Sequence, residues 1–268
     1  MLPIFTATKM KKIVILTDHT PAAQKVATLA TKMAARLGVV PVLVEIVIGQ
    51  EMTAKALDWQ GRLKADAIQL KEIMHNDDRE INIITDRISC LHPLRFDNMK
   101  RADILMIVCY AKTTVDALKG FSHSRNLALL SVPENVTIIN WQYIVYASDL
   151  QPDDVKLIKK TAATFRGAAK HIQAVHVMQS DFIPDFLQER RAAELRAGLR
   201  KLKYKQLSYR TLYGENIIPK LTSYCIENAA DMIALNYKQK NMIKRLISGD
   251  TCGHLLKVAQ LPVLFLNR

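Results

Sequence analysis

Short apolar runs alternate along the chain with longer segments in which apolar residues recur at steps of three and four. Residues 12–18 form a β-branched run that ends in a carboxylate, and this pattern predicts a buried strand. Residues 20–37 predict a helix, because Pro21 stands at its first position and Gly38 follows its last apolar residue. Residues 39–48 are almost continuously apolar and predict a second buried strand. This order predicts a right-handed βαβ unit.

The second half of the chain begins again in the same way. Residues 143–149 predict a strand that ends in Asp149, a helix opens near Pro152, and residues 171–177 predict the next strand. Later in each half an Ala-Asp pair, with its carboxylate at Asp103 or Asp231, opens another apolar strand. The strand-end aspartate precedes this second aspartate by 85 residues in the first half and by 82 in the second. Two copies of one fold explain the repetition.

Each half also carries a long helix, a third strand, a short closing helix and a final strand. For the first half we expect these elements at 59–74, 81–85, 127–130 and 136–139, and for the second at 186–202, 207–213, 255–258 and 262–266. The expected fold class is therefore α/β, with two tandem copies of an open five-stranded parallel sheet that carries helices on both faces. We place the domains at residues 1–140 and 141–268, each with its own sheet.

Composition restricts the class of protein. The 268 residues are 49% hydrophobic and 24% charged, which is typical of a globular chain and excludes disordered and collagen-like classes. Residues 1–8 lack the basic and apolar segments of a signal peptide, and no run of about 18 apolar residues occurs. The four cysteines include no C-x-x-C pair, so reduced thiols are expected. We therefore expect a cytoplasmic protein without membrane contact.

The chain is basic, and the excess charge is concentrated in its second half. Lys and Arg number 38 against 25 Asp and Glu, a net charge of +13. The first 140 residues hold 18 basic and 14 acidic side chains, and the rest hold 20 and 11. Much of the excess lies between residues 190 and 210. This segment is interpreted either as a surface for anionic partners or as a solvated helix face, and a positive field alone specifies no partner.

With these residues placed, the chain resembles the universal stress protein family in its tandem two-domain form, over nearly its whole length. The resemblance implies a HUP-like, adenine nucleotide alpha hydrolase-like fold, in which the last strands of paired domains meet; here these would be residues 136–139 and 262–266. The residues that carry the resemblance are the strand-end aspartates, part of the second strand of the second half and the C-terminal segment: Asp18, Asp149, His176, Val177, Gly214, Glu215, Ile217, Ala230–Ile233 and Asn236–Phe265.

The C-terminal segment keeps the register of the family's nucleotide loop but not its glycines. In ATP-binding members this loop holds a glycine, two residues, a glycine, nine residues, and a glycine followed by Ser or Thr. Here the corresponding residues are Asn236, Gln239, Gly249, Asp250 and Thr251. Glycine is needed where a Cβ would keep a phosphate oxygen from the backbone N–H groups, and Gln239 has one. A nucleotide is therefore disfavoured at this loop.

Asp250 has two interpretations. Its carboxylate replaces the family's hydroxyl donor, and its repulsion of a polyphosphate should cost on the order of 1 kcal/mol or more. The alternative is an N-cap of the following helix, where the helix dipole favours negative charge. The resemblance also implies that Asp18, Asp149 and Val177 lie beside the nucleoside in members that bind one. A strand-end aspartate is as readily the cap of the next helix.

No other catalytic or metal-binding motif is present. The sequence lacks G-x-x-x-x-G-K-[ST], G-x-G-x-x-G, G-x-S-x-G and H-E-x-x-H, and its seven histidines show no metal-ligand spacing. His176 is interpreted as a hydrogen-bonded core residue. Cys252, near a predicted helix start, is either a redox candidate or a buried inert thiol. We therefore expect no catalytic residue, no metal and no bound cofactor.

Three functional hypotheses follow. The first is a non-catalytic universal stress protein that acts in stress response or signalling through protein contacts, with a degenerate nucleotide loop. The alternative is an adenine-nucleotide-binding switch that uses the loop of the C-terminal domain. The third, an electrostatic nucleic-acid binder, is disfavoured because aromatic residues are not interleaved with the basic ones. The expected partners are an unidentified protein, the paired domain within the chain and a second copy in a homodimer.

Overall fold

The computed structural model describes residues 11–47, 59–74, 84–89, 100–121, 127–165, 169–178, 186–202, 204, 206–237, 255–256 and 258–267. Its strands are β1 (Lys12–Thr17), β2 (Val40–Val47), β3 (Ile84–Ser89), β4 (Ile104–Tyr110), β5 (Ala128–Val132), β6 (Tyr143–Ala147), β7 (His171–Met178), β8 (Leu207–Tyr213), β9 (Met232–Asn236) and β10 (Val263–Leu266). Its α-helices are α1 (Pro21–Leu37), α2 (Trp59–Met74), α3 (Ala111–Phe121), α4 (Asp154–Thr164), α5 (Phe186–Lys201) and α6 (Ile217–Glu227).

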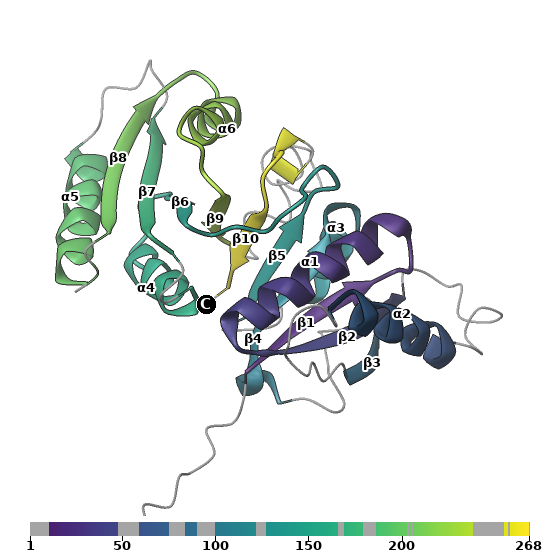
Figure 1. Ribbon diagram of the computed structural model, residues 1–268. Helices are drawn as coiled ribbons and strands as arrows, with labels where there is room; N and C mark the ends of the chain where they lie inside the picture. The colour runs from purple at the N-terminus through teal and green to yellow at the C-terminus, as the bar shows by residue number, and fades with distance from the viewer. Residues whose placement is uncertain are drawn as a thin grey trace, which may run out of the picture.

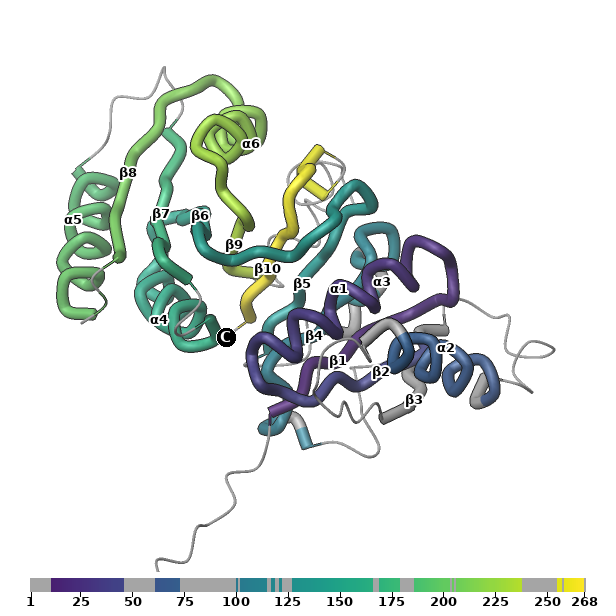
Figure 2. Tube along the Cα trace, viewed as in Figure 1, coloured from purple at the N-terminus to yellow at the C-terminus, as the bar shows by residue number. Residues whose placement is uncertain are grey.

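The described strands form one ten-stranded sheet in the order β3-β2-β1-β4-β5-β10-β9-β6-β7-β8 (Figures 1 and 2). The order β3-β2-β1-β4-β5 in the first half is repeated as β8-β7-β6-β9-β10 in the second. Within each half all neighbours are parallel. The expected α/β class, with two tandem copies of one five-stranded parallel arrangement, is therefore confirmed.

The two halves share one sheet, so the expectation of two separate sheets is wrong. β5 and β10 pair in antiparallel register, with Leu130 opposite Leu264 and Leu129 opposite Phe265. This pairing satisfies the edges that five-stranded open sheets would otherwise expose. The division of the chain at residues 140 and 141 stays a prediction.

The final strand of the first half lies earlier than expected. Residues 127–130 were expected as a helix and 136–139 as the strand, but the strand is β5 and residues 136–139 are irregular. All five residues of β5 are buried, because the strand lies between β4 and β10 in the interior of the sheet. A short apolar run of this kind fits a strand or a buried helix equally well by periodicity.

Other boundaries follow the sequence with small shifts. The expected N-cap at Thr20 is confirmed, and Gly38 ends α1 in the left-handed conformation with φ of 66°. β3 begins at Ile84, so the expected strand at 81–85 overlaps it only at its end, and residues 81–83 lie outside the described residues. Neither α3 nor α6 is among the helices that the sequence pattern predicts.

Helices cover both faces of the sheet, and the core on each face continues from one half into the other. The α1/α4 face, covered by α1, α2, α4 and α5, buries Ile13 and Leu130 of the first half in the same cluster as Leu264 of the second. The α3/α6 face, covered by α3 and α6, likewise joins Leu129 to Phe265. The sheet and both core layers are therefore continuous across the boundary.

The segment between the halves is fixed by Trp141, which is 1% exposed. The guanidinium of Arg36, in the last turn of α1, lies 4.1 Å from the centre of the Trp141 ring and donates to the carbonyl of Ile139 at 3.2 Å. On the other side the ring of Phe165, at the end of α4, lies 5.8 Å from Trp141. One aromatic side chain thus packs between the first helices of the two halves.

Lys160 on α4 reaches across the boundary. Its Nζ donates to the carbonyl of Leu127 at 3.2 Å, and the same carbonyl also accepts from the backbone N–H of Asn267 at 3.2 Å. Burial, and to a smaller extent repulsion by Lys156, lowers the pKa of Lys160 to about 8. The folded state therefore disfavours the charged form of this amine.

Replacement of Lys160 by methionine should stabilise the protein at neutral pH, because it removes a partly desolvated charge and leaves the Leu127 carbonyl bonded to Asn267. With a folded-state pKa of about 8 and an ordinary value of 10.5, the wild type should gain stability as pH rises between them. Lys160→Met should lack this gain. Urea midpoints from pH 7 to 10.5 measure this gain in stability, and Lys159→Met, at an exposed lysine, is the control. Equal pH profiles for the wild type and Lys160→Met would contradict the account.

Candidate functional site

The first strand of each half lies where the strand order reverses. β1 pairs with β2 on one side and with β4 on the other, and β6 pairs in the same way with β7 and β9. In open α/β sheets, ligands bind in the crevice outside the carboxyl ends of the strands at this point. The turns after β1 and β6, which carry Asp18 and Asp149, are therefore the candidate functional sites.

The two turns have the same local structure. The N–H of His19 donates to Oγ1 of Thr17 at 3.0 Å, and the N–H of Leu150 donates to Oγ of Ser148 at 3.1 Å. His19 and Leu150 have φ values of 62° and 57°, in the left-handed region that side chains with a Cβ rarely adopt. Because the same strained conformation occurs in both halves, we interpret it as a feature of the site and not of one loop.

The two strand-end aspartates differ in their contacts. Oδ1 of Asp18 accepts from the N–H and the hydroxyl of Thr20 at 3.1 and 2.6 Å, and Oγ1 of Thr20 caps α1 by accepting from the N–H of Ala23 at 3.3 Å. Asp18 therefore supports a helix cap. The carboxylate of Asp149 is exposed and makes no hydrogen bond within the described part of the chain.

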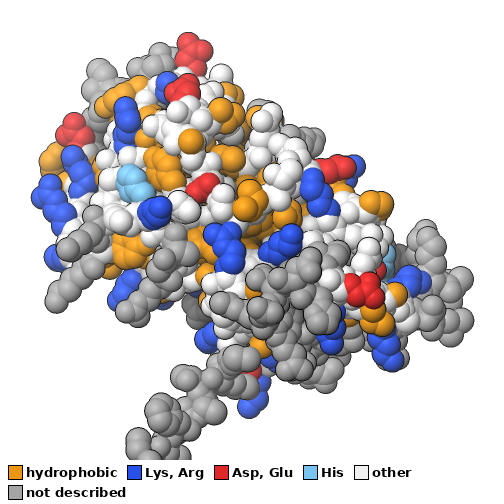
Figure 3. Space-filling view, viewed as in Figure 1, with side chains coloured by type: hydrophobic (Ala, Val, Ile, Leu, Met, Phe, Trp, Pro, Cys, Tyr) orange, Lys and Arg blue, Asp and Glu red, His pale blue; other side chains and the backbone are white. Residues whose placement is uncertain are grey.

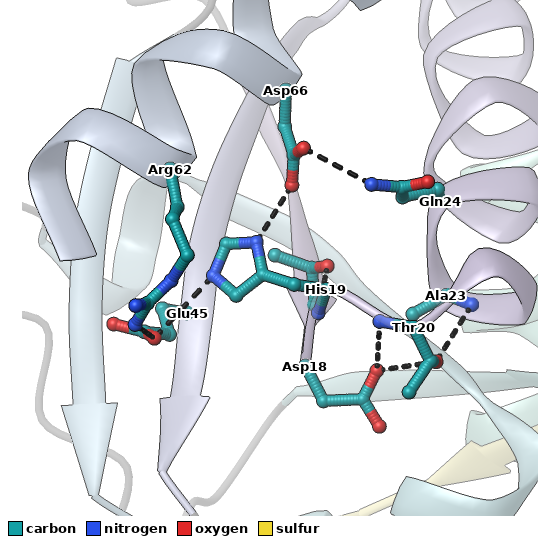
Figure 4. Close-up of polar contacts among 9 residues, drawn as sticks. Asp18, His19, Thr20, Ala23, Gln24, Glu45, Arg62 and Asp66 are labelled. Carbon is teal, nitrogen blue, oxygen red and sulfur yellow. Dashed lines mark hydrogen bonds and ion pairs between the residues drawn. The ribbon is translucent and has the colours of Figure 1, made fainter. Parts of the chain in front are cut away.

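A charged cluster closes the first-half site (Figure 4). Nδ1 of His19 lies 2.8 Å from Oδ2 of Asp66, and Nε2 approaches Oε1 of Glu45 at 3.4 Å, an ion-pair distance without hydrogen-bond geometry. Nη2 of Arg62 contacts the same Glu45 oxygen at 3.0 Å, and Gln24 donates to Oδ1 of Asp66 at 3.2 Å. The cluster ties the turn after β1 to β2, α1 and α2.

The cluster is largely shielded from water. The side chains of His19, Asp66 and Glu45 are 16%, 13% and 8% exposed. A cavity of about 220 Å³ between α1 and α2 lies beside it, lined by Pro21, Gln24, Lys25, Ala27, Thr28, Asp66, Gln69 and Leu70. The sequence pattern missed this arrangement because its members are far apart in the chain. The one available signal was Glu45, a charge within an apolar strand.

In the second half a buried carboxyl takes a different role. Asp154, at the start of α4, is fully buried and accepts from the hydroxyls of Tyr146 and Ser148 at 2.9 and 2.6 Å and from the N–H of Gln151 at 3.2 Å. Burial raises the pKa of Asp154. Nδ1 of His176 lies 2.9 Å from the carbonyl of Ser148, so the expected hydrogen bond is present, but the side chain is half-buried and not part of the core.

Asn236, at the end of β9, is 8% exposed, and neither polar atom of its side-chain amide has a hydrogen-bond partner among the described residues. Leu235 pairs with Ala147, so Asn236 lies level with Ser148 of the turn after β6. Strand alternation directs Asn236 to the α1/α4 face, whereas Val177 belongs to the core of the α3/α6 face. The structure therefore separates these two side chains.

The other predicted site residues, Gln239, Gly249, Asp250 and Thr251, lie outside the described residues, as does Cys252. Within the described ranges no group of three or more His, Cys, Asp or Glu side chains could hold a metal ion. The described helices include none long and apolar enough to cross a membrane. Cys109 and Cys225 are buried thiols, and burial raises the pKa of Cys225 to about 12, so it is not a reactive thiolate.

Comparisons with known proteins identify the fold. No family model matches the chain, and a search of curated proteins finds no match either. A universal stress protein from Archaeoglobus fulgidus DSM 4304 matches 96% of this chain and 96% of its own, with a TM-score of 0.59 and 12% identity. A protein from Pseudomonas aeruginosa UCBPP-PA14, assigned to the same family, matches 96% and 93% with a TM-score of 0.55 and 14% identity.

The matches extend over both halves of the chain, so they concern the tandem arrangement and not one half alone. The chain therefore has the α/β fold of tandem universal stress proteins, as its sequence pattern indicates.

Replacement of Asp66 by alanine should destabilise the protein by about 1–3 kcal/mol, because it leaves Nδ1 of His19 and the Gln24 amide without their acceptor in a shielded site. Asp18→Ala, which loses only the exposed contacts to Thr20, should cost about 1 kcal/mol or less. Free energies of unfolding from urea titrations compare the two variants. Equal losses would contradict the role given to the cluster.

The buried Asp154 should make stability depend on pH. Its pKa is raised above the ordinary 3.8, so its contribution to folding is fully present below that value and is lost as pH rises through the folded-state pKa. Asp154→Asn should remove this dependence, and Glu215→Gln, on an exposed carboxylate, should keep it. Urea midpoints measured upward from about pH 4 test this; the same profile for Asp154→Asn and wild type would refute it.

Proposed function

We propose that this protein is a non-catalytic universal stress protein that acts in stress response or signalling through protein contacts, with a degenerate nucleotide site. The observation that carries the proposal is the first-half site. There the side chain of His19 bridges Glu45 and Asp66 across the carboxyl ends of β1 and β2. If a nucleoside lay at this turn, as the likeness in fold suggests, the Asp66 carboxylate would repel its polyphosphate, whereas the Glu45 carboxylate is paired with Arg62.

The second half supports the same function by its sequence. Gln239 and Asp250 stand where a phosphate loop needs a glycine and a hydroxyl, and Asn236 replaces a further glycine. We extend the proposal to two domains, residues 1–140 and 141–268, to a homodimer and to a cytoplasmic location. These assignments follow from the repeat, the composition and the likeness in fold.

One observation favours a second candidate, an adenine-nucleotide switch that uses the loop of the C-terminal domain. Within the described part of the chain the buried Asn236 amide has no hydrogen-bond partner, and leaving such a group unsatisfied costs about 1–3 kcal/mol. A bound small molecule at the carboxyl end of β9 would satisfy it. The proposed function and this candidate differ in one directly measurable property, the affinity for nucleotide.

Purified protein should release no stoichiometric ATP on denaturation, and Mg-ATP should barely raise its melting temperature. A millimolar ligand with a millimolar Kd stabilises by only about 0.4 kcal/mol, which is a shift of about 1 °C for a chain of this size. Mass analysis of the released ligand and thermal scans with Mg-ATP measure both quantities. Tight binding by the unmodified protein would replace the proposed function by the nucleotide switch.

A converse experiment tests whether the loop residues are the obstacle. The triple variant Asn236→Gly, Gln239→Gly and Asp250→Ser should gain measurable Mg-ATP binding, because it restores backbone approach and removes the carboxylate. The matched control changes the same three residues to alanine, which removes the side chains but keeps each Cβ. Binding by the alanine variant at the same strength would show that glycine is not the missing feature.

A further inference from the structure

β8 is an outermost strand of the described sheet (Figure 1). It pairs in parallel with β7 over all seven of its residues, and no described strand pairs with its other edge. α5 packs beside it on the α1/α4 face. An unpaired edge of this length is a template for an added strand.

Two hydrogen bonds fix which peptide groups of β8 face outward. The carbonyl of Gln206 accepts from Ile172 of β7 at 2.9 Å, and the N–H of Gly214 donates to Met178 at 3.0 Å. In a parallel ladder alternate residues bond to the same neighbour. The even-numbered residues from 206 to 214 therefore face β7. The N–H and C=O groups of the odd-numbered residues point away from the sheet: Leu207, Tyr209, Thr211 and Tyr213.

Arginines lie on both sides of this edge. On the α1/α4 face the guanidinium of Arg196 lies 5.7 Å from the centre of the Tyr209 ring, and Arg200 follows one helical turn later on the same side of α5. On the α3/α6 face Arg210 lies 5.3 Å from the Tyr224 ring. All three arginines are exposed.

Among the described residues, these arginines have no acidic partner. In the described part of the chain no carboxylate forms an ion pair with Arg196, Arg200 or Arg210, whereas Arg190 pairs with Glu194 at 3.0 Å. In Figure 3, Lys and Arg side chains lie at this end of the molecule, as they do over the rest of the face in view. The edge therefore combines unpaired backbone groups with positive charge on both faces.

We propose that the β8 edge binds an extended acidic peptide segment of a partner protein, which adds as an eleventh strand. Alternate side chains of an added strand point to opposite faces, so acidic residues would meet Arg196 and Arg200 on one face and Arg210 on the other. A nucleic acid would use the arginines but not the outward peptide groups, so the edge favours a peptide. This surface rests on the proposed function, action through protein contacts, and supplies its partner.

The test is a fluorescence titration with a labelled seven-residue peptide, the length of β8, made of valine, threonine and glutamate with glutamates on both faces. Control peptides carry lysine in place of glutamate, or a central proline that removes a backbone donor. The wild-type protein should bind only the first peptide. Arg196→Glu with Arg210→Glu should weaken it at least about tenfold at low salt, whereas Lys32→Glu with Lys64→Glu, an equal charge change in the first half, should not.

A second pair of variants tests the backbone. Thr211→Pro removes an outward N–H without breaking the ladder to β7 and should abolish binding, whereas Thr211→Ala keeps the N–H and should bind. Hydrogen exchange of the wild-type protein, which needs no variant to fold, should show slower exchange at Tyr209 and Thr211 on adding peptide. Equal binding of the proline peptide, or unchanged exchange at these amides, would overturn strand addition.

The remaining outcomes also decide the proposal. Failure of every peptide to bind would overturn it, and so would an oligonucleotide that binds in place of the peptide through the same arginines. A parallel titration with Mg-ATP reports on the proposed function and not on the edge. If neither the peptide nor ATP binds, only the proposed role of the β8 edge is rejected. Tight ATP binding instead rejects the proposed function.

Discussion

The antiparallel pairing of β5 with β10 determines the architecture of the molecule. Four residue pairs, from Ala128 with Leu266 to Ser131 with Val263, join two five-stranded parallel sheets into one. The closing strand of each half thereby becomes an interior strand, and its backbone groups are satisfied within the chain. The edges left at the ends of the described sheet belong to β3 and β8.

The direction of this pairing also places the candidate sites. All strands of the first half run one way and all strands of the second run the other, so their carboxyl ends lie at opposite margins of the shared sheet. The turn with His19 and the turn with Leu150 are therefore at opposite margins. Two equivalent sites exist in the fold, and each has its own chemistry: a solvent-shielded charged cluster in the first half and a buried carboxyl in the second.

The elements with strong local signals could be predicted from the sequence. α1 has a capping residue, a proline and a terminal glycine, and β8 has clear strand propensity, so their positions follow from local rules. β5 could not be placed in this way, because its short apolar run gains its strand conformation from pairing with β4 on one side and with β10, more than 130 residues away, on the other. The joined sheet likewise depends on an edge-to-edge contact that no local pattern encodes.

The site was predictable in position but not in chemistry. The strand-end aspartates mark both turns, yet the hydrogen bonds that fill the first site join His19 to Asp66, 47 residues further along. Asn236 was expected from the register of a loop, but its burial without a partner among the described residues is visible only in three dimensions. Contacts between distant residues decide what each turn can bind, and a single sequence carries no direct record of them.

The central claim is that the β5–β10 pairing makes the two halves one cooperative structure. The chain has two tryptophans, so Trp59→Phe leaves Trp141, at the boundary, as a unique fluorescent probe. Urea unfolding of this variant followed by Trp141 emission and by far-ultraviolet circular dichroism is the most direct test. The account predicts coincident transitions with one midpoint. Two separate steps in the dichroism, with Trp141 changing in only one of them, would contradict it.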